Sequence, residues 1–346
     1  MGTRVEGANA TASGTLRSVG ARRRELLDTV RQYANGPLLR LLHASGRLIH
    51  IEPAAHGARS LVYFVEIDGQ PRMVLRAVPR WPDAWRVAHN LRHLAALSLP
   101  VPRLLAADCS LLTRLRWGFS PIVEERIEGS HVDALGRSEP AIRAVARTLA
   151  RFHGVQRRRW GSPGLPRWGS YRSYQLANMA RRARDLSAVL ENRPTEGLVR
   201  WCREQSRAAP LDAPFCLAHN RVHSANFVIA PDGQAYAIDL LECRYGAFAV
   251  DVAWALEQIC LADPERMSWF LDAYFRDQPE AAREVFERSR PFFEADYHLA
   301  RATTYARRLT RKARARGANE RRLCILRGHI QHLAALTGLE MTLVEP

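Results

Sequence analysis

The chain has 346 residues, of which 47% are hydrophobic, and a formal net charge of +16 at pH 7. This composition supplies a core for one large domain or two modest lobes, and it excludes a low-complexity or fibrous chain. Lys312 is the only lysine, so the positive charge comes from arginine. Such a bias indicates first a GC-rich coding sequence and only second a polyanionic partner.

No apolar run approaches the length of about 20 residues that a membrane-spanning helix needs, so we expect no membrane span. The six cysteines are scattered, without a C-x-x-C pair or zinc-ligand spacing, which indicates buried thiols in a reducing cytoplasm. The polar segment 1–21 lacks the apolar stretch of a signal peptide and is predicted to be a disordered lead. We therefore expect a cytoplasmic protein.

The first ordered half of the chain is predicted to be rich in strands. Apolar residues at helical spacing predict a helix over 26–33, which Gly36-Pro37 ends or bends. From Leu48 the period changes to two, and strands are predicted over 48–51, 61–67 and 73–78, the last two joined by an Asp68-Gly69 turn. A helix over 83–98 and a strand with a linker over 119–129 follow. We predict an N-terminal lobe, residues 22–125.

The second half is predicted to be mostly helical. A helix over 141–155 carries His153 on its buried stripe, where a structural role is expected. A Gly-, Pro- and Trp-rich stretch over 160–169 is predicted to be a surface loop. Further helices are predicted over 171–190, 198–205, 252–261, 265–276, 280–286, 291–309 and 321–336. These elements form a predicted C-terminal lobe, residues 126–346.

Within this lobe, the segment 215–251 packs polar residues between two short apolar runs. The runs 227–229 and 235–238 read as strands, and Pro231-Asp232-Gly233-Gln234 supplies the turn of a hairpin. Asn226 enters this hairpin and Asp239 leaves it, so their side chains are expected to lie close together. An amide and a carboxylate in this arrangement suit a divalent cation and its phosphate ligand. The entering loop also carries His219, Asn220, Arg221 and His223.

This segment resembles the catalytic and metal segment of the kinase-like small-molecule phosphotransferases, which include aminoglycoside phosphotransferases and choline kinases. The family pattern is H-[GN]-D-x-x-x-x-N, an apolar hairpin and I-D. Here the chain has His219-Asn220-Arg221, then Asn226 and Ile238-Asp239, so Arg221 occupies the position of the catalytic Asp. Asp251, in a V-D-V-A-W run, resembles the start of a family helix.

The resemblance implies an α+β, bilobal protein-kinase-like fold, with a small β-rich N-lobe and a larger, mostly helical C-lobe. It also implies ATP, or another nucleoside triphosphate, and Mg²⁺ as cofactors, with Asn226 and Asp239 as the metal residues. The acceptor is expected to be a small hydroxylated or anionic molecule.

The same resemblance assigns nucleotide-binding positions in the N-terminal lobe. Gly57 lies in the loop where the family has its nucleotide-covering turn, and Arg76 lies where a basic residue grips the phosphates. The backbone of Glu124, Glu125 and Arg126 would meet the adenine edge. The side chains of Glu124, Glu125 and Glu128 could equally belong to an ordinary solvated linker. Asn90 stands where the family has a Glu that pairs with the phosphate-gripping residue, and an amide cannot neutralise a guanidinium.

Arg221 leaves three hypotheses open, because a general base contributes about 10²–10⁴-fold and arginine cannot accept a proton at physiological pH. In the first, His223 or His219 replaces the base, and the protein is a phosphotransferase acting on a hydroxyl. In the second, it is a pseudokinase that binds nucleotide or an anionic ligand held by Arg221, and acts as a regulator or scaffold. In the third, Arg221 grips substrate phosphate or carboxylate in different transfer chemistry.

A dense basic run lies near the C-terminus, over residues 307–316. We expect it to be a solvated helix face and loop, with attraction of acidic or phosphorylated partners as the alternative. No aromatic residue is interleaved in the run to stack on bases, which argues against nucleic-acid binding.

Overall fold

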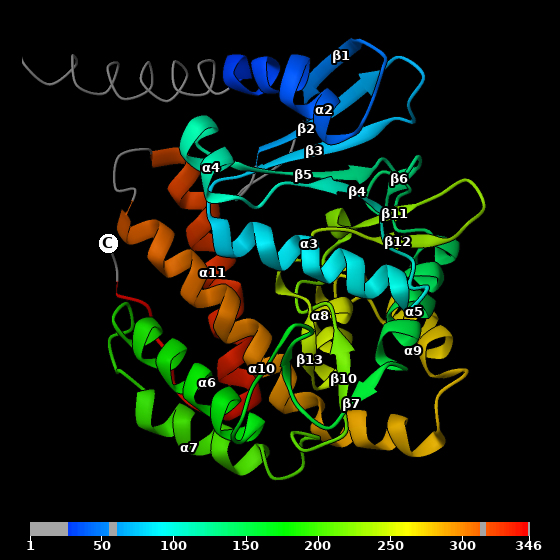
Figure 1. The fold of residues 1–346 in the computed structure, drawn as a ribbon. Coiled ribbons are helices and arrows are strands. Elements are labelled where there is room, and N and C mark those ends of the chain that lie inside the picture. The colour runs from blue at the N-terminus through cyan, green and yellow to red at the C-terminus, as the bar shows by residue number, and fades with distance from the viewer. Residues whose placement is uncertain (1–26, 55–60, 312–315, 345–346) are drawn as a thin grey trace, which may run out of the picture. The chain divides into compact units, whose positions relative to one another are not determined.

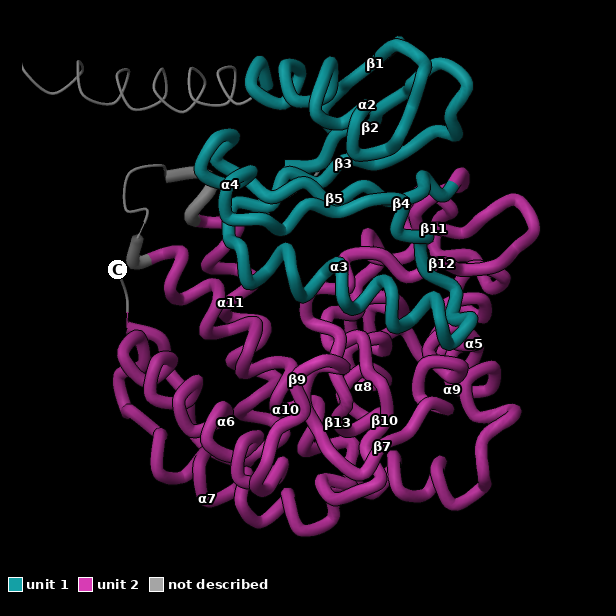
Figure 2. Tube along the Cα trace, viewed as in Figure 1, with its two compact units in different colours: residues 1–127 teal, residues 128–346 magenta. Residues whose placement is uncertain are grey.

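The computed structural model describes residues 27–54, 61–311 and 316–344. The chain divides into two compact units, Met1–Ile127 and Glu128–Pro346 (Figure 2). Within the described residues, no helix is both long enough and apolar enough to cross a membrane. The predicted lead over 1–21 and the predicted nucleotide-loop residue Gly57 lie outside the described residues.

The first unit is built on a five-stranded antiparallel sheet with the strand order β1-β2-β3-β5-β4. Two of the predicted strands, β2 and β3, have the bounds that the sequence pattern indicated. Gly69 turns between them with a φ of 69°, a left-handed conformation that glycine adopts without strain. The strands are β1 (Leu48–Pro53), β2 (Leu61–Ile67), β3 (Met73–Val78), β4 (Leu104–Ala107) and β5 (Ser120–Glu125).

Helices cover both faces of this sheet. Residues 27–33 are helical and continue through a π-helical turn, η1 (Ala34–Leu38), into α2 (Leu39–Leu41), so Pro37 distorts the helix without ending it. Tyr33 and Leu38 pack with Tyr63, Leu75 and Val123 in the buried core of one face. Figure 1 shows α3 (Trp81–Ala96) along the other side of the sheet, with the short α4 (Leu111–Trp117) at one end.

The second unit is mostly helical, as the sequence predicted. Its longest helix, α10, runs unbroken where two helices over 280–286 and 291–309 were predicted, so that division was wrong. Phe286 and Phe292, on either side of Pro291, are both buried, and their burial offsets the cost of about 3 kcal/mol for an interior proline. The helices are α5 (Glu139–His153), α6 (Tyr171–Ser187), α7 (Thr195–Gln205), α8 (Phe248–Gln258), α9 (Pro264–Phe275), α10 (Glu280–Arg311) and α11 (Arg316–Thr337).

Two small sheets in this unit hold the segment 215–251. One has the order β12-β11-β6, and the other β7-β10-β13-β8-β9. The predicted hairpin is confirmed, with Phe227 opposite Ala237 and Ile229 opposite Ala235. The strands are β6 (Ser130–His131), β7 (Gln156–Arg157), β8 (Gly161–Ser162), β9 (Leu165–Pro166), β10 (Phe215–Ala218), β11 (Phe227–Ile229), β12 (Ala235–Ala237) and β13 (Arg244–Gly246).

Candidate active site

The loop that follows β10 is held at its start by one buried carboxylate. Asp251, which is fully buried, accepts hydrogen bonds from the backbone N–H of His219 at 2.6 Å and of Asn220 at 2.8 Å. His153 donates to the same carboxylate through Nε2 at 3.1 Å, and its Nδ1 accepts from the Tyr274 hydroxyl at 2.6 Å. Asp251 therefore fixes the backbone of the loop, and these contacts give His153 a structural place.

The far side of the loop is tied to the end of the hairpin. His219 donates through Nε2 to the carbonyl of Ile238 at 3.0 Å, and the N–H of Ile238 donates to the carbonyl of Asn226 at 2.9 Å. His219 is fully buried, and this burial is the main cause that lowers its pKa, so it is neutral at pH 7. The geometry favours a structural role for His219, in which it holds the loop. It argues against a role in which His219 accepts a proton from substrate.

The hairpin brings the three central residues of the predicted site together. Arg221 donates from Nη1 to Oδ2 of Asp239 at 2.7 Å, and its backbone carbonyl accepts from Nδ2 of Asn226 at 2.8 Å. The side chains of Arg221 and Asp239 are 25% and 28% exposed, so the ion pair is accessible from solvent. A guanidinium thus neutralises the carboxylate that the resemblance assigns to the metal.

The donor set can be compared with what Mg²⁺ requires. Asn226 and Asp239 offer amide and carboxylate oxygens, which Mg²⁺ prefers, and this ion usually takes its remaining ligands from water and nucleotide phosphates. Among the described residues, no group of three or more His, Cys, Asp or Glu side chains could hold a metal ion. Asn226 and Asp239 fit a nucleotide-bound Mg²⁺ when Arg221 moves away from Asp239.

His223 is the half-buried titratable group of the loop. Burial and then the nearby Arg221 lower the pKa of His223 to about 4, so it is neutral at pH 7 but weakly basic. Beside it, the Ser224 hydroxyl donates to Oδ2 of Asp133 at 2.7 Å. No local pattern in the sequence points to Asp133, because its contact with the loop spans 91 residues of chain.

In the first unit, Arg76 forms a buried ion pair with Glu124. Arg76 Nε lies 2.6 Å from Glu124 Oε1, and the two side chains are 11% and 5% exposed. Arg76 is opposite Ile122 in the sheet, so Glu124 is the diagonal neighbour on the same face. The solvated-linker interpretation of the Glu124 side chain was therefore wrong. The carboxylate that neutralises Arg76 comes from β5, although Asn90 of α3 is where the family pattern places its partner.

The backbone predicted to meet adenine is already partly engaged within the sheet. The N–H of Glu125 donates to the carbonyl of Arg103 at 2.9 Å, and that of Arg126 donates to the carbonyl of Arg72 at 3.1 Å. The Arg126 guanidinium lies 4.2 Å from the centre of the Phe64 ring. An adenine contact in this segment must therefore use backbone carbonyls or the residues after Arg126.

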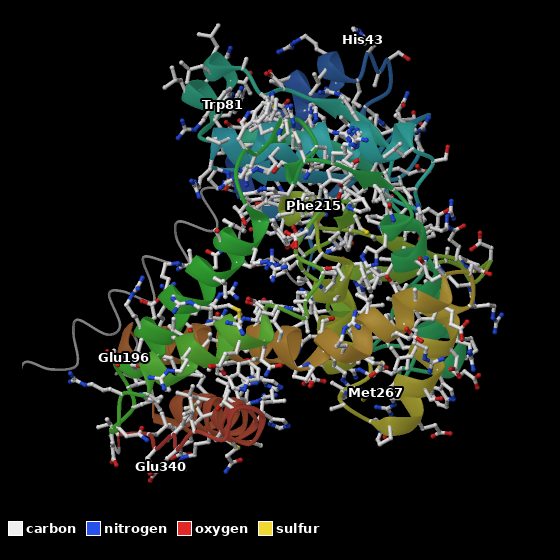
Figure 3. All side chains as sticks on the ribbon, turned by 90° about the horizontal axis from the view of Figure 1, so that it is seen from below. His43, Trp81, Glu196, Phe215, Met267 and Glu340 are labelled. Carbon is white, nitrogen blue, oxygen red and sulfur yellow. The ribbon has the colours of Figure 1, made fainter. Side chains whose placement is uncertain are left out.

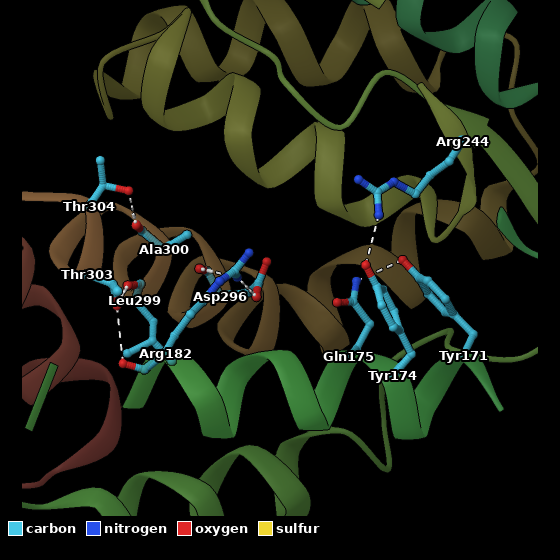
Figure 4. Close-up of polar contacts among 10 residues, drawn as sticks. All are labelled: Tyr171, Tyr174, Gln175, Arg182, Arg244, Asp296, Leu299, Ala300, Thr303 and Thr304. Atoms are coloured by element: carbon cyan, nitrogen blue, oxygen red, sulfur yellow. Dashed lines mark hydrogen bonds and ion pairs between the residues drawn. The ribbon is translucent and has the colours of Figure 1, made fainter. Parts of the chain in front are cut away.

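A second polar network follows closely after Asp239 in the chain. Arg244 donates from Nη1 to the Tyr174 hydroxyl at 2.9 Å, and Gln175 donates to the Tyr171 hydroxyl at 2.8 Å (Figure 4). Arg244 also donates from Nη2 to Glu242 at 2.9 Å. Burial is the largest influence on Tyr174, but the Arg244 charge opposes it and the pKa of the phenol is lowered. These fixed donors and acceptors border the loop over 160–169.

The structure thus combines a β-rich unit that contains a buried arginine–glutamate pair with a helical unit in which an anchored loop precedes a hairpin and an Asp. The chain matches the model of the phosphotransferase enzyme family (APH) over residues 50–318. It belongs to that family. Comparison with curated protein sequences gave no match.

Solved structures support the same fold. Aminoglycoside phosphotransferase APH(4)-Ia is similar with a TM-score of 0.63 and 15% identity, over 90% of this chain and 98% of that chain. An ethanolamine kinase from Plasmodium vivax is similar with a TM-score of 0.58 and 12% identity, over 84% and 82%. A thermostable variant of the first enzyme was solved with ADP and hygromycin B. At these identities the similarity shows the fold, and the predicted α+β, protein-kinase-like class is confirmed.

Proposed function

We propose that this protein is a phosphotransferase that moves the γ-phosphate of ATP, or of another nucleoside triphosphate, to a hydroxyl of a small molecule. The observation that carries the proposal is the loop over 219–226, held on one side by Asp251 and on the other by Ile238. This loop joins the hairpin through the hydrogen bond from the Ile238 N–H to the Asn226 carbonyl, and Asp239 follows Ile238 directly. Membership of the phosphotransferase family supports this function.

Most of the catalysis of phosphoryl transfer is positioning and charge neutralisation, because the transition state is loose. Arg76, oriented by Glu124, would bind the phosphates, and Asn226 and Asp239 would hold Mg²⁺. When bound, the metal ion neutralises phosphate charge. Arg221 cannot accept the hydroxyl proton. His223 can, but with a pKa of about 4 it is a weak base, so turnover is expected to be slow.

A second candidate function is nucleotide binding without turnover, and the contact between Arg221 and Asp239 favours it. The 2.7 Å ion pair satisfies the carboxylate with a cation that belongs to the chain. Mg²⁺ must compete with that guanidinium, and no carboxylate stands at position 221. A pseudokinase of this kind would bind the nucleotide phosphates through arginine and act as a regulator or scaffold.

The two candidates predict different behaviour of the purified full-length protein. Thermal shift with ATP, with and without Mg²⁺, measures binding, and ADP release over a panel of hydroxylated small molecules measures turnover. Turnover that Asn226→Ala and Asp239→Asn both abolish supports the phosphotransferase. Asp212→Asn is the control, because this Asp is 77% exposed and pairs with Arg172 on the surface.

ATP binding without turnover, together with ATP hydrolysis gained by Arg221→Asp, supports the pseudokinase. This variant restores a carboxylate at the family position and releases Asp239 from its ion pair. Absence of a thermal shift with any nucleoside triphosphate overturns both candidates.

A further inference from the structure

The short helix α4 lies between β4 and β5 and has well-defined ends. The Ser110 hydroxyl caps its first turn by accepting from the N–H of Thr113 at 3.2 Å. Asp108 accepts from the N–H of Ser110 at 2.8 Å and from the Thr113 hydroxyl at 2.5 Å. Gly118 ends the helix with a φ of 76°. The seven residues LLTRLRW therefore form a helix with defined ends, and each side chain has a defined direction around its axis.

One face of α4 is made of exposed leucines. At about 100° per residue, Leu111, Leu112 and Leu115 fall within a sector of roughly 100°. They are 60%, 79% and 73% exposed, whereas leucine is a residue that folding normally buries. Trp117 lies on the opposite side and packs edge-on against Tyr33, with 5.5 Å between ring centres. The tryptophan holds the helix to the core of its unit, so the leucines are presented outward.

Trp81, at the start of α3, is another exposed apolar side chain, and it is tied to the segment just before α4. Its indole N–H donates to the carbonyl of Cys109, just before α4, at 2.5 Å. Arg114 of α4 in turn donates to the carbonyl of Pro79 at 3.1 Å. Two hydrogen bonds therefore join the start of α3 to α4 and the segment before it. Trp81 is 42% exposed, and Figure 3 shows its position on the unit. We call Trp81, Leu111, Leu112 and Leu115 the α4 patch.

The charges around the α4 patch are mainly positive. Arg114 and Arg116 flank the leucine sector on either side of the helix, and both are exposed. Two carboxylates lie nearby in the chain: Asp83 is paired with Arg80 at 3.6 Å, and Asp108 accepts the capping hydrogen bonds. Leucines in the centre, arginines at the flanks and a tryptophan at the margin are the composition of helices that lie at a membrane interface.

We propose that the α4 patch docks on a membrane surface that contains anionic lipids. The leucines would enter the boundary between head groups and acyl chains. The guanidinium groups of Arg114 and Arg116, which contact the Pro79 carbonyl and the Trp117 ring in the structure, would turn toward the lipid phosphates. A second copy of the chain fits less well, because a two-fold contact through one patch brings the same arginines together. This assignment does not depend on the proposed phosphotransferase activity.

The test is flotation of the full-length protein with vesicles of phosphatidylcholine alone or with about a third phosphatidylglycerol, a fraction that gives a strongly negative surface. We expect binding to the anionic vesicles, weakened by salt. The double variant Leu112→Ser/Leu115→Ser should lose about tenfold or more in vesicle affinity, since two exposed apolar groups no longer leave water. Its melting temperature should not change, because neither side chain is buried.

The matched control is Leu165→Ser, which removes a leucine that is 55% exposed in the other unit and should leave vesicle binding unchanged. Absence of vesicle binding, equal binding to neutral and anionic vesicles, or an equal loss in the control overturns the proposal. A dimer in sedimentation that the double variant breaks, without vesicle binding, would assign the patch to a second copy and also overturn it.

Discussion

The buried carboxylate of Asp251 makes a quantitative prediction about the loop that it holds. Asp251→Asn keeps the shape of the side chain but replaces one acceptor oxygen by an NH₂ group, which must then face a backbone N–H or the His153 ring. Each hydrogen bond to the charged group is worth about 1.5–3 kcal/mol, and breaking a buried charged contact typically costs about 3–5 kcal/mol. We expect a loss of about 3–5 kcal/mol in the free energy of unfolding.

Urea unfolding of the wild-type protein and the variant measures this loss. Hydrogen exchange of the His219 and Asn220 amides should quicken by tenfold or more, since each tenfold change corresponds to about 1.4 kcal/mol. Asp212→Asn removes a surface ion pair of similar chemistry and should cost about 0.5 kcal/mol or less. A loss below about 1 kcal/mol for Asp251→Asn, or unchanged exchange, would refute the argument that this carboxylate holds the loop.

The next two predictions concern the Arg76–Glu124 ion pair and the pKa of His223. Glu124→Gln leaves a buried guanidinium without its countercharge and should destabilise the protein by about 3 kcal/mol. Arg76→Met/Glu124→Leu should recover most of that stability in the same urea assay, and an equally unstable double variant would contradict the ion-pair argument. Burial and Arg221 lower the pKa of His223 to about 4, so the unfolded chain takes up a proton below about pH 6.5 and the folded protein does not. Stability should therefore fall as the pH falls from 6.5 to 4, and His223→Asn should flatten this fall in melting scans; an unchanged pH profile would count against the low pKa.

The effect of Arg221 on the proposed function depends on whether its guanidinium leaves the Asp239 carboxylate free to bind a metal ion. In the structure the Arg221 guanidinium donates to this carboxylate at 2.7 Å, so the two charges neutralise each other. Arg221→Gln, which cannot neutralise Asp239, should therefore increase the effect of Mg²⁺ on the ATP-induced thermal shift. An identical Mg²⁺ effect in the variant and the wild type would show that the ion pair does not compete with the metal.

Local patterns in the sequence were sufficient for several features. The alternation over 61–67 and 73–78 defined β2 and β3, and the turn 231–234 between two apolar runs defined the hairpin. The motif from His219 to Asp239 indicated the family through its resemblance to a known pattern, and the family model confirms that membership. The residues of each pattern are close together in the chain, so local backbone geometry is sufficient to form the strands and the hairpin.

Contacts between distant segments were decided only by the tertiary structure. Glu124 pairs with Arg76 because β5 lies next to β3 in the sheet, and no local pattern states that neighbour relation. The unbroken α10 depends on how phenylalanines on both sides of Pro291 are buried. The sequence thus determined the hairpin and the family, and it predicts which residues form the site. Packing decided which charges meet there, because an ion pair requires two side chains at one point in space, however far apart they are in the chain.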